Sequence, residues 1–108
     1  SNSPMTKEKA EYYTNSICFH AQQASDKFLK AYLAYHDVDF PRTHDLDFLL
    51  IECQKIDKEA FQIDFKSLTD FGVSVRYPDD FYIPEEKEAL EYRDTAISVK
   101  EIVERLIK

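Results

Sequence analysis

Cationic side chains are the clearest carriers of chemistry in this sequence of 108 residues. Lys27 and Lys30 are three residues apart, so on a helix they share one face. That face is either solvated and ion-paired, or it lines a groove and binds phosphate. Arg76 is followed by Tyr77, and the sequence leaves two roles open for this pair. Either both side chains pin a loop to the body of the protein, or Arg76 contacts an anionic ligand.

His44 is a further candidate, because it follows Thr43, a residue with the chemistry of a helix N-cap. His44 either packs as a polar residue at the helix start or contacts a ligand at the positive end of the helix. The three histidines do not fall at helical metal spacing, and Cys18 and His20 diverge on a helix. The sequence also has no glycine-rich phosphate loop, no CxxC pair and no HExxH motif. We therefore expect no metal and no cofactor.

The element that must position these residues is a long helix over about residues 7–35, with Thr6 as its cap. Its apolar residues recur every three or four positions, which predicts one buried stripe with Phe28 fully inside. The stripe consists of Tyr13, Ile17, Ala21, Ala24, Phe28, Ala31 and Tyr35. The opposite row is polar and consists of His20, Gln23, Lys27 and Lys30. Asp26 precedes Lys30 by one turn, which predicts an ion pair.

Three further helices are expected after a loop over residues 36–42. The second covers about residues 44–56, with Thr43 as its cap. The third follows a break near Asp57, and its apolar set is Phe61, Phe65, Leu68, Phe71 and Val75, with Gly72 near its end. An irregular stretch from Arg76 to Pro84 precedes the last helix. That helix has an apolar face of Ala89, Ala96, Val99, Val103 and Leu106, flanked by Leu90, Ile97, Ile102 and Ile107.

Composition favours a single all-α domain over residues 6–108, because one glycine and four prolines leave little material for hairpin turns. Residues 1–5 are expected to be a disordered N-terminus or a tag remnant. The net charge of −7 argues against non-specific nucleic-acid binding as the main role. No apolar run reaches membrane-spanning length. Cys18 and Cys53 lie at or beside apolar helical positions, which favours free buried thiols in a reducing cytoplasm.

Three segments together resemble the HEPN domain family. The first is Phe19-His20-Ala21-Gln22-Gln23-Ala24 followed by Asp26-Lys27 and Lys30-Ala31, where Asp26 stands in place of the more common Glu. The others are Thr43-His44-Asp45-Leu46 and Val75-Arg76-Tyr77-Pro78-Asp79. The resemblance extends over most of the chain from about Tyr12. It implies an up-and-down four-helix bundle, although the chain before the Gln-Gln-Ala helix is too short for the usual preceding helix. The first helix is therefore expected to be missing, truncated or supplied otherwise.

The resemblance also implies a homodimer, contact with nucleotide or nucleic acid, and a nucleotidyltransferase partner in a two-component toxin–antitoxin system. HEPN ribonucleases pair an arginine at the position of Arg76 with a histidine a few residues later, but no histidine follows His44 here. The sequence therefore predicts a non-catalytic binding module. The alternatives are a divergent ribonuclease that uses Arg76 with other groups, and a structural protein-interaction domain.

Overall fold

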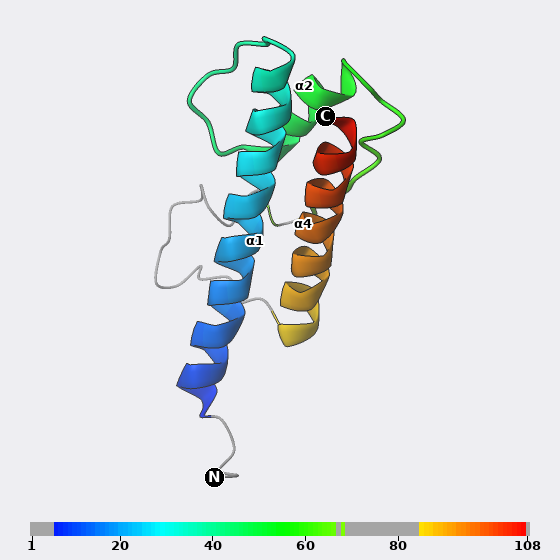
Figure 1. The fold of residues 1–108 in the computed structure, drawn as a ribbon. Helices are drawn as coiled ribbons and strands as arrows, with labels where there is room; N and C mark the ends of the chain where they lie inside the picture. The colour runs from blue at the N-terminus through cyan, green and yellow to red at the C-terminus, as the bar shows by residue number, and fades with distance from the viewer. Residues whose placement is uncertain (1–5, 67, 69–84, 108) are drawn as a thin grey trace.

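The computed structural model describes residues 6–66, 68 and 85–107, which include three helices and no strand. The helices are α1 (Lys7–Tyr35), α2 (Leu46–Gln54) and α4 (Glu86–Leu106). Helices α1 and α4 lie side by side and point the same way, and α2 packs near their C-terminal ends (Figure 1). The predicted all-α class is confirmed, whereas the predicted four helices are matched only approximately by this part of the chain.

The ends of α1 agree with the sequence prediction. Thr6 caps the helix, since its Oγ1 accepts a hydrogen bond of 3.2 Å from the backbone N–H of Lys9. The helix ends at Tyr35, and Asp37 then takes a φ of 58°, a left-handed conformation that stops a helix. The predicted loop begins there.

The predicted buried stripe of α1 is wrong. Of its members only Ala21 is buried, whereas Tyr13, Ala31 and Tyr35 are exposed and Phe28 is only partly covered. The face that is buried includes polar side chains and lies one position along from the predicted stripe. It consists of Thr14, Cys18, Ala21, Gln22, Ser25, Asp26, Leu29, Tyr32 and Leu33. Counting apolar residues missed this face, because four of its members are polar. Gln22 and Asp26 have polar partners, whereas the Oγ of Ser25 has no hydrogen-bond partner among the described residues.

Helix α2 is shorter than predicted, and its cap is Asp45 rather than Thr43. The Oδ1 of Asp45 accepts hydrogen bonds from the backbone N–H groups of Asp47, at 3.0 Å, and Phe48, at 3.3 Å. The Oγ1 of Thr43 instead accepts from the backbone N–H of Asp45 at 3.1 Å, which forms a turn before the helix. His44 therefore precedes the cap instead of following it.

The predicted third helix does not form over residues 57–66, which are turns and irregular chain. Two aspartate side chains here bind backbone N–H groups that a helix would use for its own hydrogen bonds. The Oδ1 of Asp57 accepts from the N–H of Ala60 at 3.1 Å, and the Oδ1 of Asp64 accepts from the N–H of Lys66 at 2.9 Å. The apolar set is nevertheless buried where the structure describes it, at Phe61, Phe65 and Leu68. Phe71, Gly72, Val75 and the stretch from Arg76 to Pro84 lie outside the described residues, as do residues 1–5.

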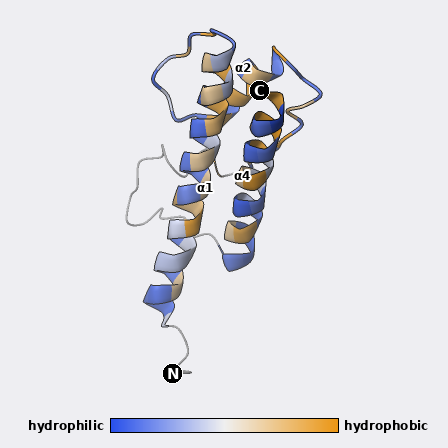
Figure 2. Ribbon diagram, in the orientation of Figure 1, coloured by the Kyte–Doolittle hydropathy of each residue, from blue (hydrophilic) through white to orange (hydrophobic). Residues whose placement is uncertain are grey.

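The last helix has the predicted apolar face. Ala89, Ala96, Val99 and Val103 are buried against α1, while Ile97 beside them stays 45% exposed. Apolar residues concentrate where α2, the C-terminal half of α1 and α4 meet, whereas the N-terminal turns of α1 are mostly hydrophilic (Figure 2). Among the helices that the structure describes, none combines the length and the apolar character needed to cross a membrane.

Candidate functional site

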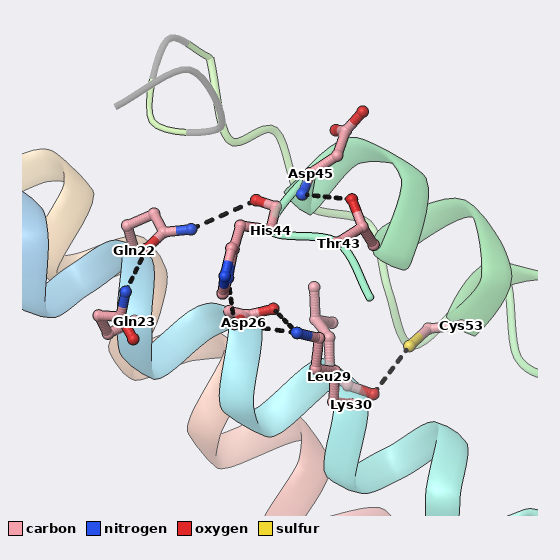
Figure 3. A network of polar contacts seen from close by, with 9 residues as sticks. All are labelled: Gln22, Gln23, Asp26, Leu29, Lys30, Thr43, His44, Asp45 and Cys53. Carbon is pink, nitrogen blue, oxygen red and sulfur yellow. Dashed lines mark hydrogen bonds and ion pairs between the residues drawn. The ribbon is translucent and has the colours of Figure 1, made fainter. Parts of the chain in front are cut away.

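The carboxylate of Asp26 is the centre of a polar cluster on α1. Asp26 is only 6% exposed, and both of its carboxylate oxygens face cations or potential cations. The Nζ of Lys30 lies 3.1 Å from Oδ1 and donates to Oδ2 at 3.3 Å, which confirms the predicted ion pair. The Nδ1 of His44 lies 3.1 Å from Oδ2, as Figure 3 shows. Oδ2 therefore accepts both hydrogen bonds, whereas Oδ1 has the ion pair with Lys30 but no hydrogen-bond partner among the described residues.

Gln22, one turn before Asp26, binds the backbone of the same histidine. Its Nε2 donates to the carbonyl oxygen of His44 at 3.3 Å, and its Oε1 accepts from the Nε2 of Gln23 at 3.1 Å (Figure 3). Two successive turns of α1 thus hold the main chain and the ring of His44. We call Gln22, Asp26, Lys30 and His44 the polar seam, since they join α1 to the segment that leads into α2.

His44 is placed by the turn described above, because the Thr43 and Asp45 hydrogen bonds fix the backbone on either side of it. Its side chain is 55% exposed, so the ring contacts Asp26 with one nitrogen and remains accessible to solvent. Nδ1 is the donor in this contact whether the ring is charged or is the neutral tautomer protonated at that nitrogen. Protonation of the other nitrogen would therefore add a positive charge here without breaking the seam.

A shallow open depression of about 590 Å³ lies beside the polar seam. Five of its seven lining residues are polar or charged, although carbon atoms supply most of the lining surface. The lining consists of His20, Gln23, Ala24, Asp26, Lys27, Phe28 and Lys30. Lys27 is exposed, and within the described residues it makes no ion pair, whereas Lys30 is already paired with Asp26. Two lysines and one carboxylate give the depression a small positive charge, in contrast to the net charge of −7 on the whole chain.

In the comparison with known protein families, the family model described as HEPN domain matches residues 6–106. The chain belongs to the HEPN domain family. No curated protein and no solved structure matches the chain significantly. The polar seam joins two of the segments that resemble the family, the Gln-Gln-Ala segment of α1 and the Thr-His-Asp-Leu segment that leads into α2.

Three of the five predicted site residues of this HEPN domain come together. His44 and Lys30 share Asp26, and Lys27 lies in the adjoining depression. Arg76 and Tyr77 lie outside the described residues, so the clamp and the ligand contact both remain predictions for them. Sequence analysis missed Gln22 as a buried residue and Asp26 as the centre of the cluster. Their spacing of one helical turn within the family segment was the available signal.

The cysteines of the HEPN domain are free and buried, as predicted. Burial, followed by the nearby charge of Glu52, raises the pKa of the Cys53 thiol from an ordinary 9.0 to about 12. Burial and then Glu88 raise the pKa of Cys18 to about 11. Both thiols are therefore protonated near neutral pH, and Cys53 donates to the carbonyl oxygen of Leu29 over 3.6 Å. Among the described residues no group of three or more His, Cys, Asp or Glu could hold a metal ion.

Proposed function

We propose that this HEPN domain is a non-catalytic module that binds a phosphate group of a nucleotide or nucleic acid in the depression beside the polar seam. The observation that carries the proposal is the placement of Lys27 and Lys30 in the lining of the depression, with His44 in contact with Asp26 beside them. Lysine and protonated histidine both donate charge-assisted hydrogen bonds to phosphate oxygens. The exposed Lys27 makes the first contact, because it gives up no ion pair among the described residues.

Electrostatics favour a small ligand or a single phosphate over a long nucleic-acid backbone. Asp26 neutralises much of the charge of Lys30, and the acidic remainder of the chain repels a polyanion. A site that makes one or two phosphate contacts has a shallow salt dependence, with a slope of log K against log salt of about −1 to −2. A steeper slope would indicate a more extended basic surface.

The positions of the histidines favour a non-catalytic domain. All three of them, at positions 20, 36 and 44, precede Arg76, so none can follow it in the order that HEPN ribonucleases use. Proton transfer near neutral pH is the role that histidine performs in such a pair. Tyr82 lies in the corresponding part of the sequence, but an ordinary tyrosine is a poor base at that pH.

Equilibrium binding tests the proposal, with ATP and a fluorescent single-stranded RNA as probes. Lys27→Ala is expected to weaken binding about fivefold or more, whereas Lys58→Ala, an exposed lysine away from the site, serves as the matched control. Equal affinity for wild type and Lys27→Ala would exclude this site. Metal-free cleavage of the RNA that is abolished by Arg76→Ala would instead support the divergent ribonuclease.

We also infer that the domain works with other chains in the cytoplasm, as a homodimer and beside a nucleotidyltransferase in a two-component toxin–antitoxin system. Family membership and the exposed apolar side chains of Tyr12, Phe19 and Tyr35 on α1 support this inference. Light scattering at micromolar concentration tests the homodimer, and co-purification with a nucleotidyltransferase encoded next to this gene tests the second partner. A monomer that never co-purifies would contradict both.

A further inference from the structure

An apolar groove of about 350 Å³ runs between α1 and α4. Its apolar lining comes from both helices and includes Tyr13, Ile17, Ala24 and Phe28 of α1 and Ala96 and Ile97 of α4. Tyr13 and Ile97 are 47% and 45% exposed, so the described part of the chain leaves the groove open to solvent. Large apolar side chains that gather in an open hollow mark an interaction site more often than a folding defect.

The shape of the groove fits a helix. From Tyr13 to Phe28 it follows fifteen residues of α1, which corresponds to about 22 Å or four helical turns. Within the described residues only α1 and α4 line this groove, and no described third helix fills it. A helix laid along α1 and α4 would cover Phe28 and Ile97 with one apolar stripe, whose anchors recur every three or four residues.

The charges around the groove specify the chemistry of that helix. The polar members of the lining are Ser16, His20, Arg93 and Lys100, and none of them is acidic. Arg93 is partly neutralised by Asp94, whose Oδ1 lies 3.2 Å from its Nη2, so Lys100 is the stronger cation at this edge. On a chain with a net charge of −7, a hollow bordered by cations favours an acidic occupant.

We propose that this groove binds an amphipathic helix of another protein, about four turns long, with an apolar stripe bordered by Asp or Glu. The acidic residues meet Lys100 and Arg93, and the apolar stripe covers Tyr13, Phe28 and Ile97. The proposal goes beyond the phosphate site, which borders the groove at Ala24 and Phe28 but uses Lys27 and Lys30.

Two synthetic helical peptides test the proposal by fluorescence anisotropy with the full chain. Both carry leucines at helical spacing on one face, and they differ in having glutamate or lysine along its borders. The acidic peptide is expected to bind about tenfold more tightly than the basic one, and Lys100→Glu is expected to remove or reverse that preference. Ile97→Gln should weaken binding of the acidic peptide about tenfold, whereas Ile51→Gln, at a similarly exposed isoleucine of α2, should not.

Three results would overturn the proposal. The first is equal affinity for the two peptides, which would show that Lys100 and Arg93 do not select an acidic helix over a basic one. The second is unchanged binding by Ile97→Gln. The third is a dimer that Ile97→Gln converts to monomer and that excludes the peptide, because a second copy would then be the occupant. Failure here is separable from failure of the phosphate site, since Lys27→Ala affects ATP binding and Ile97→Gln affects peptide binding.

Discussion

Two faces of α1 are built on opposite principles. One face is buried although it carries polar groups, and its Gln22 and Asp26 hold the segment before α2. The other face is apolar at Tyr13 and Phe28, yet it lines an open groove. The buried carboxylate of Asp26 is stabilised by its ion pair with Lys30 and its contact with His44, whereas an exposed apolar ring costs little in a monomer. The buried polar face thus determines the fold, and the open apolar face is available for binding.

The largest expected effect is the difference in unfolding free energy between Leu29→Ala on the buried face and Phe28→Ala on the open face. Leu29 is fully buried, and Leu29→Ala is expected to cost about 2–5 kcal/mol of the free energy of unfolding. Phe28 lies in the groove, so Phe28→Ala should cost only about 1–2 kcal/mol, because the space it leaves opens to solvent. Chemical denaturation of both variants measures this. A greater loss of unfolding free energy for Phe28→Ala than for Leu29→Ala would show that Phe28 belongs to the buried core.

Alkaline pH should lower the free energy of unfolding, because the Cys53 thiol on the buried side must deprotonate. Its folded pKa of about 12 is above the ordinary 9.0, so the stabilisation is fully present below pH 9.0 and is lost as pH rises toward about 12. Near pH 10.5 the expected loss from this thiol is on the order of 2 kcal/mol. Denaturation midpoints across this range should fall less steeply for Cys53→Ala than for wild type. Parallel curves for the two proteins would contradict the buried, neutral thiol.

Removal of the seam carboxylate should cost less than removal of Leu29. Asp26→Ala leaves Lys30 and His44 without their partner, but both are exposed enough to be rehydrated, so we expect a loss of about 1–2 kcal/mol. Asp94→Ala is the matched control, because that carboxylate is 68% exposed and should contribute less than about 0.5 kcal/mol. Thermal melts that rank Asp94→Ala as the more harmful variant would show that the seam does not hold α1 to its neighbour.

The smallest expected effect concerns the helix cap that follows the seam. Asp45→Ala should lower the free energy of unfolding by about 1 kcal/mol, the usual cost of losing an N-cap. Thr43→Ala should cost about half as much or less, because Thr43 stabilises only the turn before the cap. Denaturant midpoints for the pair check this. The reverse order would restore Thr43 as the cap that the sequence suggested.

The long helix, its caps and the apolar face of α4 could be predicted from sequence because they depend on local chemistry. Thr6 caps the helix that directly follows it, and the spacing of Ala89, Ala96 and Val99 leaves one choice of face. The orientation of α1 could not be predicted in the same way. Its apolar stripe and its buried face differ by about one residue, and only the partners of Gln22 and Asp26, supplied from twenty-two and eighteen residues away, decide between them.

The candidate site was also predictable only in part. Lys27, Lys30 and His44 were recognisable from residue type and family segment, and the Asp26–Lys30 pair followed from helical spacing. The contact between His44 and Asp26 depends on the path of the loop, which residue types do not specify. The turns over residues 57–66 show a related limit, because Asp57 and Asp64 bind backbone N–H groups where the apolar spacing indicated a helix.

The burial pattern along α1 has a kinetic consequence. Its buried residues begin at Thr14 and continue to Leu33, so the first seven residues of the helix, about two turns, carry no buried side chain. Amide hydrogens in those turns should therefore exchange through local opening at almost no free-energy cost, while amides around Leu29 should exchange only when the whole domain unfolds. Protection of the backbone amides of α1 against hydrogen exchange should thus rise along this one continuous helix, from the Thr6 cap toward the polar seam.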